Sequence, residues 1–277
     1  MTDWRECLSR SSAPARIADP NAYAAAGPAT TTSPIDGYHS TLREILVVAT
    51  PAFLAAHPVV GPLFLSGIVA TTEEYLRDLF GRIISICPVA QAHSAERQIH
   101  LGSAIWHGKG LLARGAFEGT SLASSHSIKK TIADFLHYQV QKQDRVWGVF
   151  DEFDKVCELR HGAVHSGATV PGKNAVRLKL TPVAGTPRLS VGYSEVQECA
   201  EVCTSLAVSL NLDLFEVIAE RWAKEWRTYR YWSAKTEHEH FRDIWNVFFS
   251  DFDAVRALIT SPLTMIKCKN ALRREFP

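Results

Sequence analysis

The chain has 277 residues, of which 46% are hydrophobic and 21% are charged, and its formal net charge is +1. This length provides for one large hydrophobic core or two small ones, and the composition is that of an ordinary globular protein. A net charge near zero excludes a polycation, so any binding of nucleic acid has to come from a local basic patch.

The cysteines give no sign of a metal site. No Cys/His run has the spacing of a structural zinc site, and Cys199 and Cys203, four residues apart, are typical of core packing on one helix. The first residues, Met1–Cys7, include acids and no apolar stretch of a secretory signal. We therefore expect a cytoplasmic protein with reduced thiols, no cofactor and no bound metal.

Residues 1–38 are rich in Ala, Ser, Thr and Pro and show no periodicity, which predicts a flexible N-terminal arm. A first helix is predicted over Ser40–Leu54. Residues 45–70 contain no Asp, Glu, Lys or Arg, a length that suits a membrane span, but Pro51 and Pro58 interrupt them. We therefore expect a buried helix pair and no membrane partner.

The strongest helix signal of the first half covers Pro62–Cys87, where apolar residues recur at helical spacing and Glu73 and Arg77 form an i,i+4 pair. The glycine-punctuated stretch Ser94–Leu122 predicts short helices and loops. Ser125 or Ser127 is expected to cap a helix over Ile128–Val140.

The second half predicts three long helices and one hairpin. The longest clear helix covers Gln143–Val164, followed by a small β-hairpin that pairs Ala175–Leu180 with Arg188–Val191. A helix over Ser194–Arg227 is expected to start with a Ser194/Gln197 capping box, and another covers Phe241–Ile259.

The expected domains are a helical domain over 39–228 and a C-terminal helical extension over 229–277. The extension ends in a basic tail containing Lys267, Lys269, Arg273 and Arg274. The tail suits RNA phosphates or an acidic partner, and a plain solvated tail is an equal alternative.

One arginine interrupts an apolar stripe. Val146, Phe150, Phe153 and Cys157 step by four, three and four residues, and the same rhythm reaches Arg160. An arginine in a buried stripe stays charged. It therefore has to pair with an acid, line a cleft or extend its guanidinium to the protein surface.

Two histidines accompany this arginine at the end of the same helix. His161 and His165 lie about 40° apart around an ideal helix, and Arg160 and His165 about 140° apart. A guanidinium holds phosphate oxygens through a planar fork, and an imidazole accepts or donates a proton, so the segment is a candidate for phosphate chemistry. The alternative is a structural arginine paired with Glu152, Asp154 or a distant acid.

The segment Arg160–His165 resembles the Arg-polar-x3-His signature of HEPN-domain ribonucleases, which carry it near the end of a long helix. Glu74–Phe80 is also similar to the early helix of the RiboL-PSP-HEPN branch, and the resemblance spans about Pro58 to Glu220. It implies an all-α HEPN-like helical bundle, here with a β-hairpin insert and extra C-terminal helices.

The resemblance implies a metal-independent endoribonuclease that acts as a homodimer through the motif helix. The RNA 2′-hydroxyl would attack the adjacent phosphate, with Arg160 holding that phosphate, His165 as general acid or base, and His161 orienting RNA or supporting His165. Glu74 and Arg77 are candidate supporting residues. Glu73 and Glu74 could reach the cleft and hold His165, and a surface ion pair with Arg77 is the favoured alternative. Family members act as toxins or in phage defence, which implies an antitoxin or defence-system partner. The alternative is a non-catalytic HEPN-like module that binds RNA or protein.

A further candidate RNA contact is the segment 221–232, where basic and aromatic residues alternate. Because Trp222 and Trp226 share helical spacing, an aromatic core face with solvated arginines is the favoured interpretation.

Overall fold

The computed structural model describes residues 14–25, 32–108, 111–228 and 233–276, without the side chains of 227, 234 and 235. The chain divides into two compact units, Met1–Thr31 and Thr32–Pro277. In the first unit, a 3₁₀ turn over Pro20–Tyr23 begins at Asp19, whose carboxylate accepts a hydrogen bond from the Asn21 backbone N–H at 2.9 Å. Cys7 and residues 229–232 lie outside the described part.

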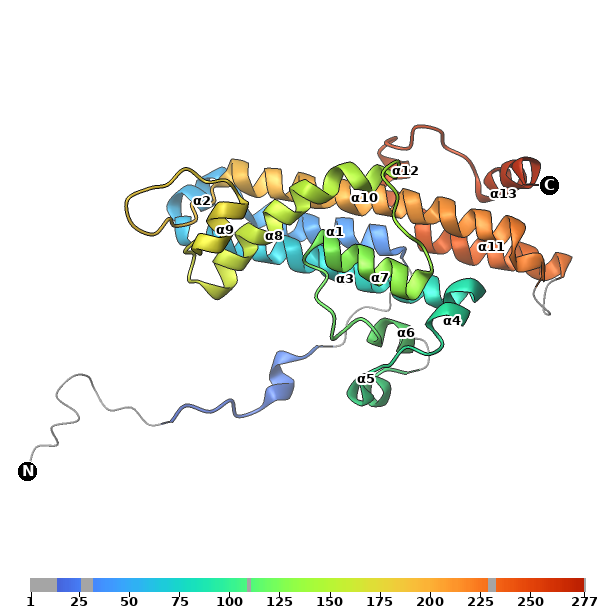
Figure 1. Ribbon diagram of the computed structural model, residues 1–277, viewed down its shortest axis with the longest axis horizontal. Coiled ribbons are helices and arrows are strands. Elements are labelled where there is room, and N and C mark those ends of the chain that lie inside the picture. Colours follow the sequence, from blue (N-terminus) through green and yellow to red (C-terminus); the bar gives the residue numbers. More distant parts are fainter. Residues whose placement is uncertain (1–13, 26–31, 109–110, 229–232, 277) are drawn as a thin grey trace, which may run out of the picture. The chain divides into compact units, whose positions relative to one another are not determined.

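The second unit is all-α (Figure 1). Its helices are α1 (Pro34–Val48), α2 (Pro51–Ala56), α3 (Gly61–Ile86), α4 (Pro88–Ser94), α5 (Leu101–Trp106), α6 (Leu112–Gly115), α7 (Ser125–Leu136), α8 (Phe150–His165), α9 (Gly172–Arg177), α10 (Tyr193–Lys224), α11 (Ala234–Phe248), α12 (Asp251–Val255) and α13 (Met265–Glu275), with 3₁₀ turns η3 (Pro58–Val60), η4 (Arg145–Val149) and η5 (Trp226–Thr228).

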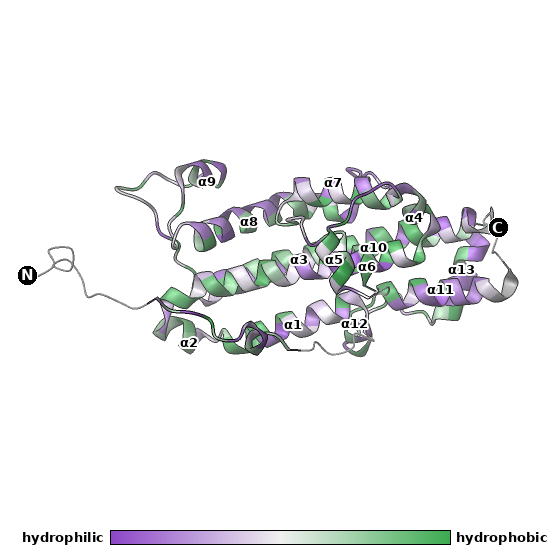
Figure 2. Cartoon of the chain, turned by 90° about the horizontal axis from the view of Figure 1, so that it is seen from below, coloured by the Kyte–Doolittle hydropathy of each residue, from purple (hydrophilic) through white to green (hydrophobic). Residues whose placement is uncertain are grey.

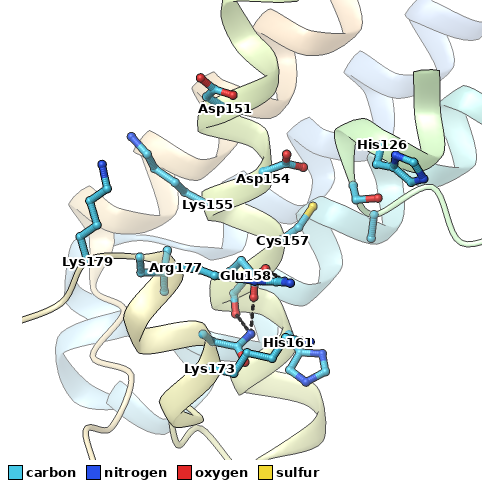
Figure 3. Close-up of a pocket in the computed structure, with 14 residues that line it drawn as sticks. His126, Asp151, Asp154, Lys155, Cys157, Glu158, His161, Lys173, Arg177 and Lys179 are labelled. Atoms are coloured by element: carbon cyan, nitrogen blue, oxygen red, sulfur yellow. Dashed lines mark hydrogen bonds and ion pairs between the residues drawn. The ribbon is translucent and has the colours of Figure 1, made fainter. Parts of the chain in front are cut away.

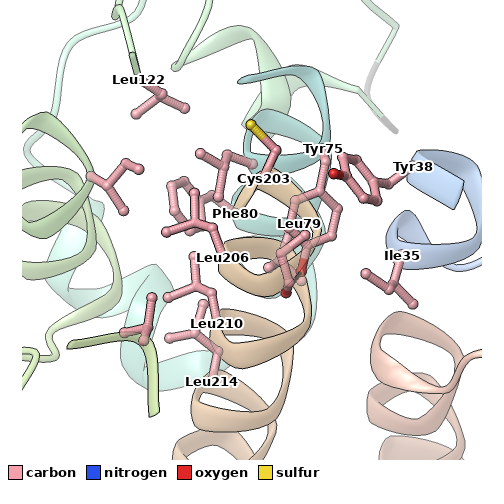
Figure 4. Close-up of a cluster of buried hydrophobic side chains, with 14 of the residues drawn as sticks. Ile35, Tyr38, Tyr75, Leu79, Phe80, Leu122, Cys203, Leu206, Leu210 and Leu214 are labelled. Atoms are coloured by element: carbon pink, nitrogen blue, oxygen red, sulfur yellow. Dashed lines mark hydrogen bonds between the residues drawn. The ribbon is translucent and has the colours of Figure 1, made fainter. Parts of the chain in front are cut away.

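Two long helices, α3 and α10, form the centre of this unit. Helix α3 contacts α1, α8, α10 and α11, and in Figure 2 apolar colouring concentrates where these helices face one another. Figure 4 shows part of the shared core, where the Tyr75 hydroxyl donates to the Ala207 backbone oxygen at 3.0 Å. Leu79 and Leu206 are fully buried there. This hydrogen bond replaces the one that the hydroxyl would make to water, so burying Tyr75 costs little free energy.

Helix α8 lies against this centre through its apolar face. Phe150, Phe153 and Val156 are buried, whereas the same helix exposes its acidic and basic residues on the opposite side. The short helix α9 is fastened to α8 by Glu158, whose carboxylate accepts hydrogen bonds from Asn174 and Arg177. These contacts fix the position of the carboxyl half of α8.

The first two helices differ from the prediction in where they begin and end. Residues 34–38, expected in the flexible arm, form the start of α1, with Ile35 and Tyr38 buried. The single helix expected over Ser40–Leu54 is two helices, because Pro51 starts α2 after the Thr50 side chain caps it.

The helix over Pro62–Cys87 is confirmed within one residue at each end, and the glycine-rich stretch holds two short helices as expected. The cap of α7 is Ser124, not Ser125 or Ser127, because the Ser124 hydroxyl accepts the Ser127 backbone N–H at 3.1 Å. The longest predicted helix begins as the 3₁₀ turn η4 before α8 proper.

The predicted β-hairpin is wrong. Ala175–Arg177 belong to α9, and the expected second strand contributes only an isolated antiparallel bridge between Thr169 and Arg188. A helical turn is favoured here because it places Asn174 and Arg177, three residues apart, on the same carboxylate of Glu158.

Helix α10 starts without the predicted Ser194/Gln197 capping box. Gly192 is the N-cap, and its backbone N–H donates to the Glu195 carboxylate at 2.9 Å. By length and composition this is the described helix that suits a membrane span, and half of its most apolar window is buried within the structure. Cys199 and Cys203 lie on its core face, as predicted from their spacing.

The C-terminal prediction joined two helices and missed a third. The helix expected over Phe241–Ile259 is divided between α11 and α12, because the Ser250 hydroxyl caps α12 through the Asp253 N–H and donates to Asp36 at 2.7 Å. The basic end, expected as a tail, is the helix α13, which contacts α10 and α11.

Candidate functional site

The carboxyl end of α8 carries the three motif residues on different sides. Arg160 is half-buried, whereas His161 and His165 are exposed. The imidazole rings of the two histidines lie 4.8 Å apart between centroids, with an angle of 46° between ring planes. The helix therefore presents two proton-transfer groups together, with the guanidinium further around its surface.

Arg160 has no ionic partner among the described residues: no acidic oxygen lies within 4.0 Å of its guanidinium. Its Nε atom is buried and makes no hydrogen bond. This contradicts the structural alternative that paired Arg160 with Glu152 or Asp154, since Glu152 binds Lys155 and Asp154 binds Ser125. A half-buried guanidinium without a counterion is well suited to take an anionic ligand.

Gly162 holds the motif turn close to the chain that follows it. A Cβ atom at this position would lie 2.9 Å from the Thr169 backbone oxygen and 3.4 Å from the Leu189 side chain. Gly162 is helical and buried, so its role here is close approach and not a deformed last turn.

A groove of about 790 Å³ runs along α8, between the start of α7 and the helix α9 (Figure 3). Its floor is one face of α8, including Asp154, Glu158 and, at its carboxyl end, His161. Its walls are formed by Ser124 and His126 from the α7 side and by Lys173, Asn174, Arg177 and Lys179 from the α9 side.

Two acids on the groove floor are occupied by neutral or cationic donors. The Asp154 carboxylate accepts from the Ser125 backbone N–H at 2.7 Å and from its hydroxyl at 2.6 Å. Glu158 binds Asn174 and Arg177 across the groove. Of the three acids that line the groove, Glu158 is therefore compensated by a cation, whereas Asp154 keeps its charge and Asp151 has no ion pair among the described residues.

Cys157 also lines the groove but does not suit nucleophilic chemistry. Burial raises the pKa of its thiol far above the ordinary value, and the charge of Arg160 opposes that rise only in part. Because the thiolate is the reactive form, a thiol of this kind is inert near neutral pH.

The two candidate supporting residues lie in other interactions. Glu74 forms an ion pair with Arg114 of α6. Arg77 donates to the backbone oxygens of Phe117 (3.4 Å) and Thr120 (3.3 Å) and pairs with Glu73 at 3.3 Å, the predicted i,i+4 contact. Both positions hold the segment after α5 against α3.

Glu73 was expected to form a surface ion pair with Arg77 or to reach the cleft and hold His165. It is buried, and its carboxylate accepts the Leu122 backbone N–H at 2.8 Å in addition to Arg77. Its place on the apolar stripe of α3, next to Leu76 and Phe80, was the signal that it faces the core.

The four basic C-terminal residues have different surroundings. Arg273 is largely buried: it pairs with Glu237, donates to the Ala223 backbone oxygen at 2.9 Å and lies 3.9 Å from the centroid of the Trp222 ring. Lys267 and Arg274 are exposed and Lys269 is half-buried. The contacts of Arg273 are those of a residue that anchors α13.

Within one chain, the motif residues do not share one pocket. His161 lines the groove, whereas Arg160 and His165 are not among its lining residues. The described residues contain no cluster of three or more His, Cys, Asp or Glu side chains arranged for a metal. Comparison with protein-family models, curated proteins and solved structures finds no match to this chain.

Proposed function

We propose that the protein is an endoribonuclease of the HEPN type, with Arg160, His161 and His165 as its catalytic residues. The observation that carries the proposal is the unpaired, half-buried Arg160 guanidinium beside two exposed imidazoles on the same helix end. A permanent cation without a protein counterion is available for a phosphate, and neighbouring imidazoles supply the proton transfers.

The proposed reaction is metal-independent, as the resemblance implies. The 2′-oxygen of the ribose forms a bond to the adjacent phosphorus, the bond from phosphorus to the 5′-oxygen breaks, and the products carry a 2′,3′-cyclic phosphate and a 5′-hydroxyl. His165 takes the proton from the 2′-hydroxyl or gives one to the leaving 5′-oxygen, and Arg160 stabilises the charge that develops on the phosphate.

A homodimer through α8 is part of the proposal. Arg160 and His165 lie about 140° apart on an ideal helix, so one copy does not direct both side chains at the same phosphate. Two copies facing each other bring residues from two helices to one target. Toxicity or phage defence, with an antitoxin or defence-system partner in the cytoplasm, is the role that the resemblance assigns.

The test is cleavage of single-stranded RNA by the purified protein in EDTA, with product ends identified chemically. Arg160→Ala and His165→Ala are expected to lose cleavage, whereas His238→Ala, on α11, is the matched control and is expected to cleave like the wild type. An intact RNA after incubation with the wild type contradicts the proposal.

A second function is favoured by one observation: only His161 of the three motif residues lines the groove. A module that binds RNA or protein needs no convergent catalytic set. Binding of RNA by the wild type without cleavage, unchanged in His165→Ala, would establish this alternative.

A further inference from the structure

The groove along α8 leads to the proposed catalytic residues. Asp151, Asp154, Glu158 and His161 line it at intervals of three or four residues, and Lys155 lies beside Asp154, so these residues share one side of the helix. His161 ends this row, and its ring contacts that of His165 one turn further on. A chain that lies in the groove therefore reaches the histidine pair at its end.

Two lysines on the walls of the groove have no acidic partner, and they face a floor that also carries the charges of Asp151 and Asp154. Lys173 and Lys179 are exposed, and neither has an acidic oxygen within 4.0 Å among the described residues. Lys155 and Arg177, in contrast, pair with Glu152 and Glu158. Figure 3 shows Lys173 beside the carboxyl end of α8, near His161, and Lys179 further along the groove.

The backbone at Lys179 is held in a conformation that lysine rarely adopts. Its φ is +55°, in the left-handed region, and hydrogen bonds from the Lys179 N–H to Val176 (3.1 Å) and from the Leu180 N–H to Ala175 (3.0 Å) close the turn after α9. A left-handed residue with this pair of hydrogen bonds is the common way in which a helix ends, and here it fixes the position of Lys179 directly after α9.

From these observations, and resting on the function proposed above, we infer that the groove binds the single-stranded RNA next to the scissile phosphate, with Lys173 and Lys179 each contacting one phosphate. Its volume of about 790 Å³ lies within the range of ligand sites, ~300–1,000 Å³. Lysine is a point charge without a planar fork, so these contacts position the strand and do not select its sequence.

The experiment measures RNA affinity across salt concentrations. A fluorescein-labelled single-stranded oligoribonucleotide of mixed sequence is titrated with full-length His165→Ala, which leaves the probe intact, and with the same protein carrying Lys173→Gln and Lys179→Gln. Lys142→Gln with Arg43→Gln is the matched control, since it removes two exposed charges outside the groove. Circular dichroism verifies that each variant is folded.

Each phosphate contact to a single strand contributes ~0.7 to the slope of log affinity against log salt. Loss of both lysines is therefore expected to reduce the slope by about 1.4, so that the affinity ratio between parent and variant shrinks about 7-fold from 50 to 200 mM salt. The control pair keeps the parent slope. Equal slopes for the groove variant and its parent overturn the inference, and so does an RNA affinity of the parent too weak to measure.

The cleavage assay separates this inference from the function on which it rests. If wild type cleaves RNA and the groove variant binds with an unchanged slope, the groove assignment fails and the ribonuclease stands. If the groove variant loses its slope but wild type cleaves nothing, the groove assignment stands as an RNA-binding site and the ribonuclease fails.

Discussion

His161 and His165 lie on consecutive turns of α8 with ring centroids 4.8 Å apart. This contact places two imidazoles at the exposed end of a helix whose other end is buried against the core. The two rings are not equivalent, however, because only His161 also lines the groove. Substitutions at the two positions should therefore have different kinetic effects.

We expect His165→Ala to lower kcat by ~10²–10⁴-fold, the usual contribution of a general acid or base. His161→Ala, which removes a groove contact, should raise KM more than it lowers kcat. Both kinetic constants are measured on the same RNA, with Tm as the check on folding. Equal losses of kcat at the two positions would contradict this division of roles.

Gly162→Ala should destabilise the protein and reduce cleavage together. The new Cβ would lie 2.9 Å from the Thr169 backbone oxygen, so the segment after α8 or the motif turn has to shift. Overpacking of this kind costs ~1–3 kcal/mol in the free energy of unfolding. Denaturant unfolding and the cleavage rate give the two readouts.

The matched control for that substitution is Gly172→Ala. This glycine begins α9, and a Cβ there would meet nothing within 4 Å. Because alanine is the better helix former by up to ~1 kcal/mol, the control should be neutral or stabilising. A loss of stability at both positions would show that the close approach at Gly162 is not the cause.

The helices α3, α8 and α10 were predictable because their apolar residues recur at helical spacing over many turns. The errors have local causes. The α9 region was read as a strand because its apolar residues alternate, and the tertiary contact with Glu158 that favours a helical turn is invisible in the sequence. The helix predicted over Ser40–Leu54 included Pro51, although this proline starts a second helix.

For the candidate site, the sequence indicates which side chains are suited to catalysis or binding, but not which side chains they contact in the folded protein. Arg160 could be identified in the sequence because it interrupts the apolar stripe. That Arg160 has no counterion could not be predicted, because it depends on where every acid of the bundle lies. The four C-terminal basic residues are indistinguishable in sequence, yet Arg273 is an anchor of α13. The lysines of the groove were missed because α9 brings them to α8 only in the folded chain.

Arg160 and Arg221 should respond in opposite ways to replacement by methionine. Arg221 is buried and donates to the Leu136 and His137 backbone oxygens, both at 2.7 Å. Arg221→Met should cost ~1.5–3 kcal/mol for each hydrogen bond made by this charged group. Arg160→Met removes an unpaired charge and keeps an apolar stem, so the free energy of unfolding should stay the same or rise while cleavage is lost.

Denaturant unfolding of the two variants is the measurement for this comparison. A destabilisation by Arg160→Met as large as that by Arg221→Met would assign Arg160 to the structure of the bundle.

Arg273→Ala should loosen α13 from the bundle. The substitution removes the ion pair with Glu237, the hydrogen bond to Ala223 and the contact with the Trp222 ring. Hydrogen exchange over Met265–Glu275 should become faster, whereas Lys267→Ala, on the exposed side of the same helix, should change stability by no more than ~0.5 kcal/mol. Unchanged exchange in Arg273→Ala would mean that other contacts hold α13.

Because the imidazole of His39 is buried, the free energy of unfolding should decrease as the pH falls below about 6.5. Its ring stacks on Phe252 at 4.4 Å and is 8% exposed, and its Nε2 lies 3.6 Å from the Asp253 carboxylate. Burial lowers the pKa of His39 below 6.5, the nearby Asp253 and Asp36 oppose that shift, and Arg256 adds to it. The folded protein therefore binds this proton less readily than the unfolded chain.

The lowered pKa of His39 makes the free energy of unfolding depend on pH through proton linkage. Well above pH 6.5 both states hold a neutral imidazole, and His39 has no effect on the pH dependence. Below that pH the unfolded chain takes up the proton first, so the free energy of unfolding falls by at most ~1.4 kcal/mol per pH unit until the folded state is also protonated. His39→Phe should flatten this part of the stability curve, and His238→Gln should not. An equally steep fall in His39→Phe would place the titrating group elsewhere.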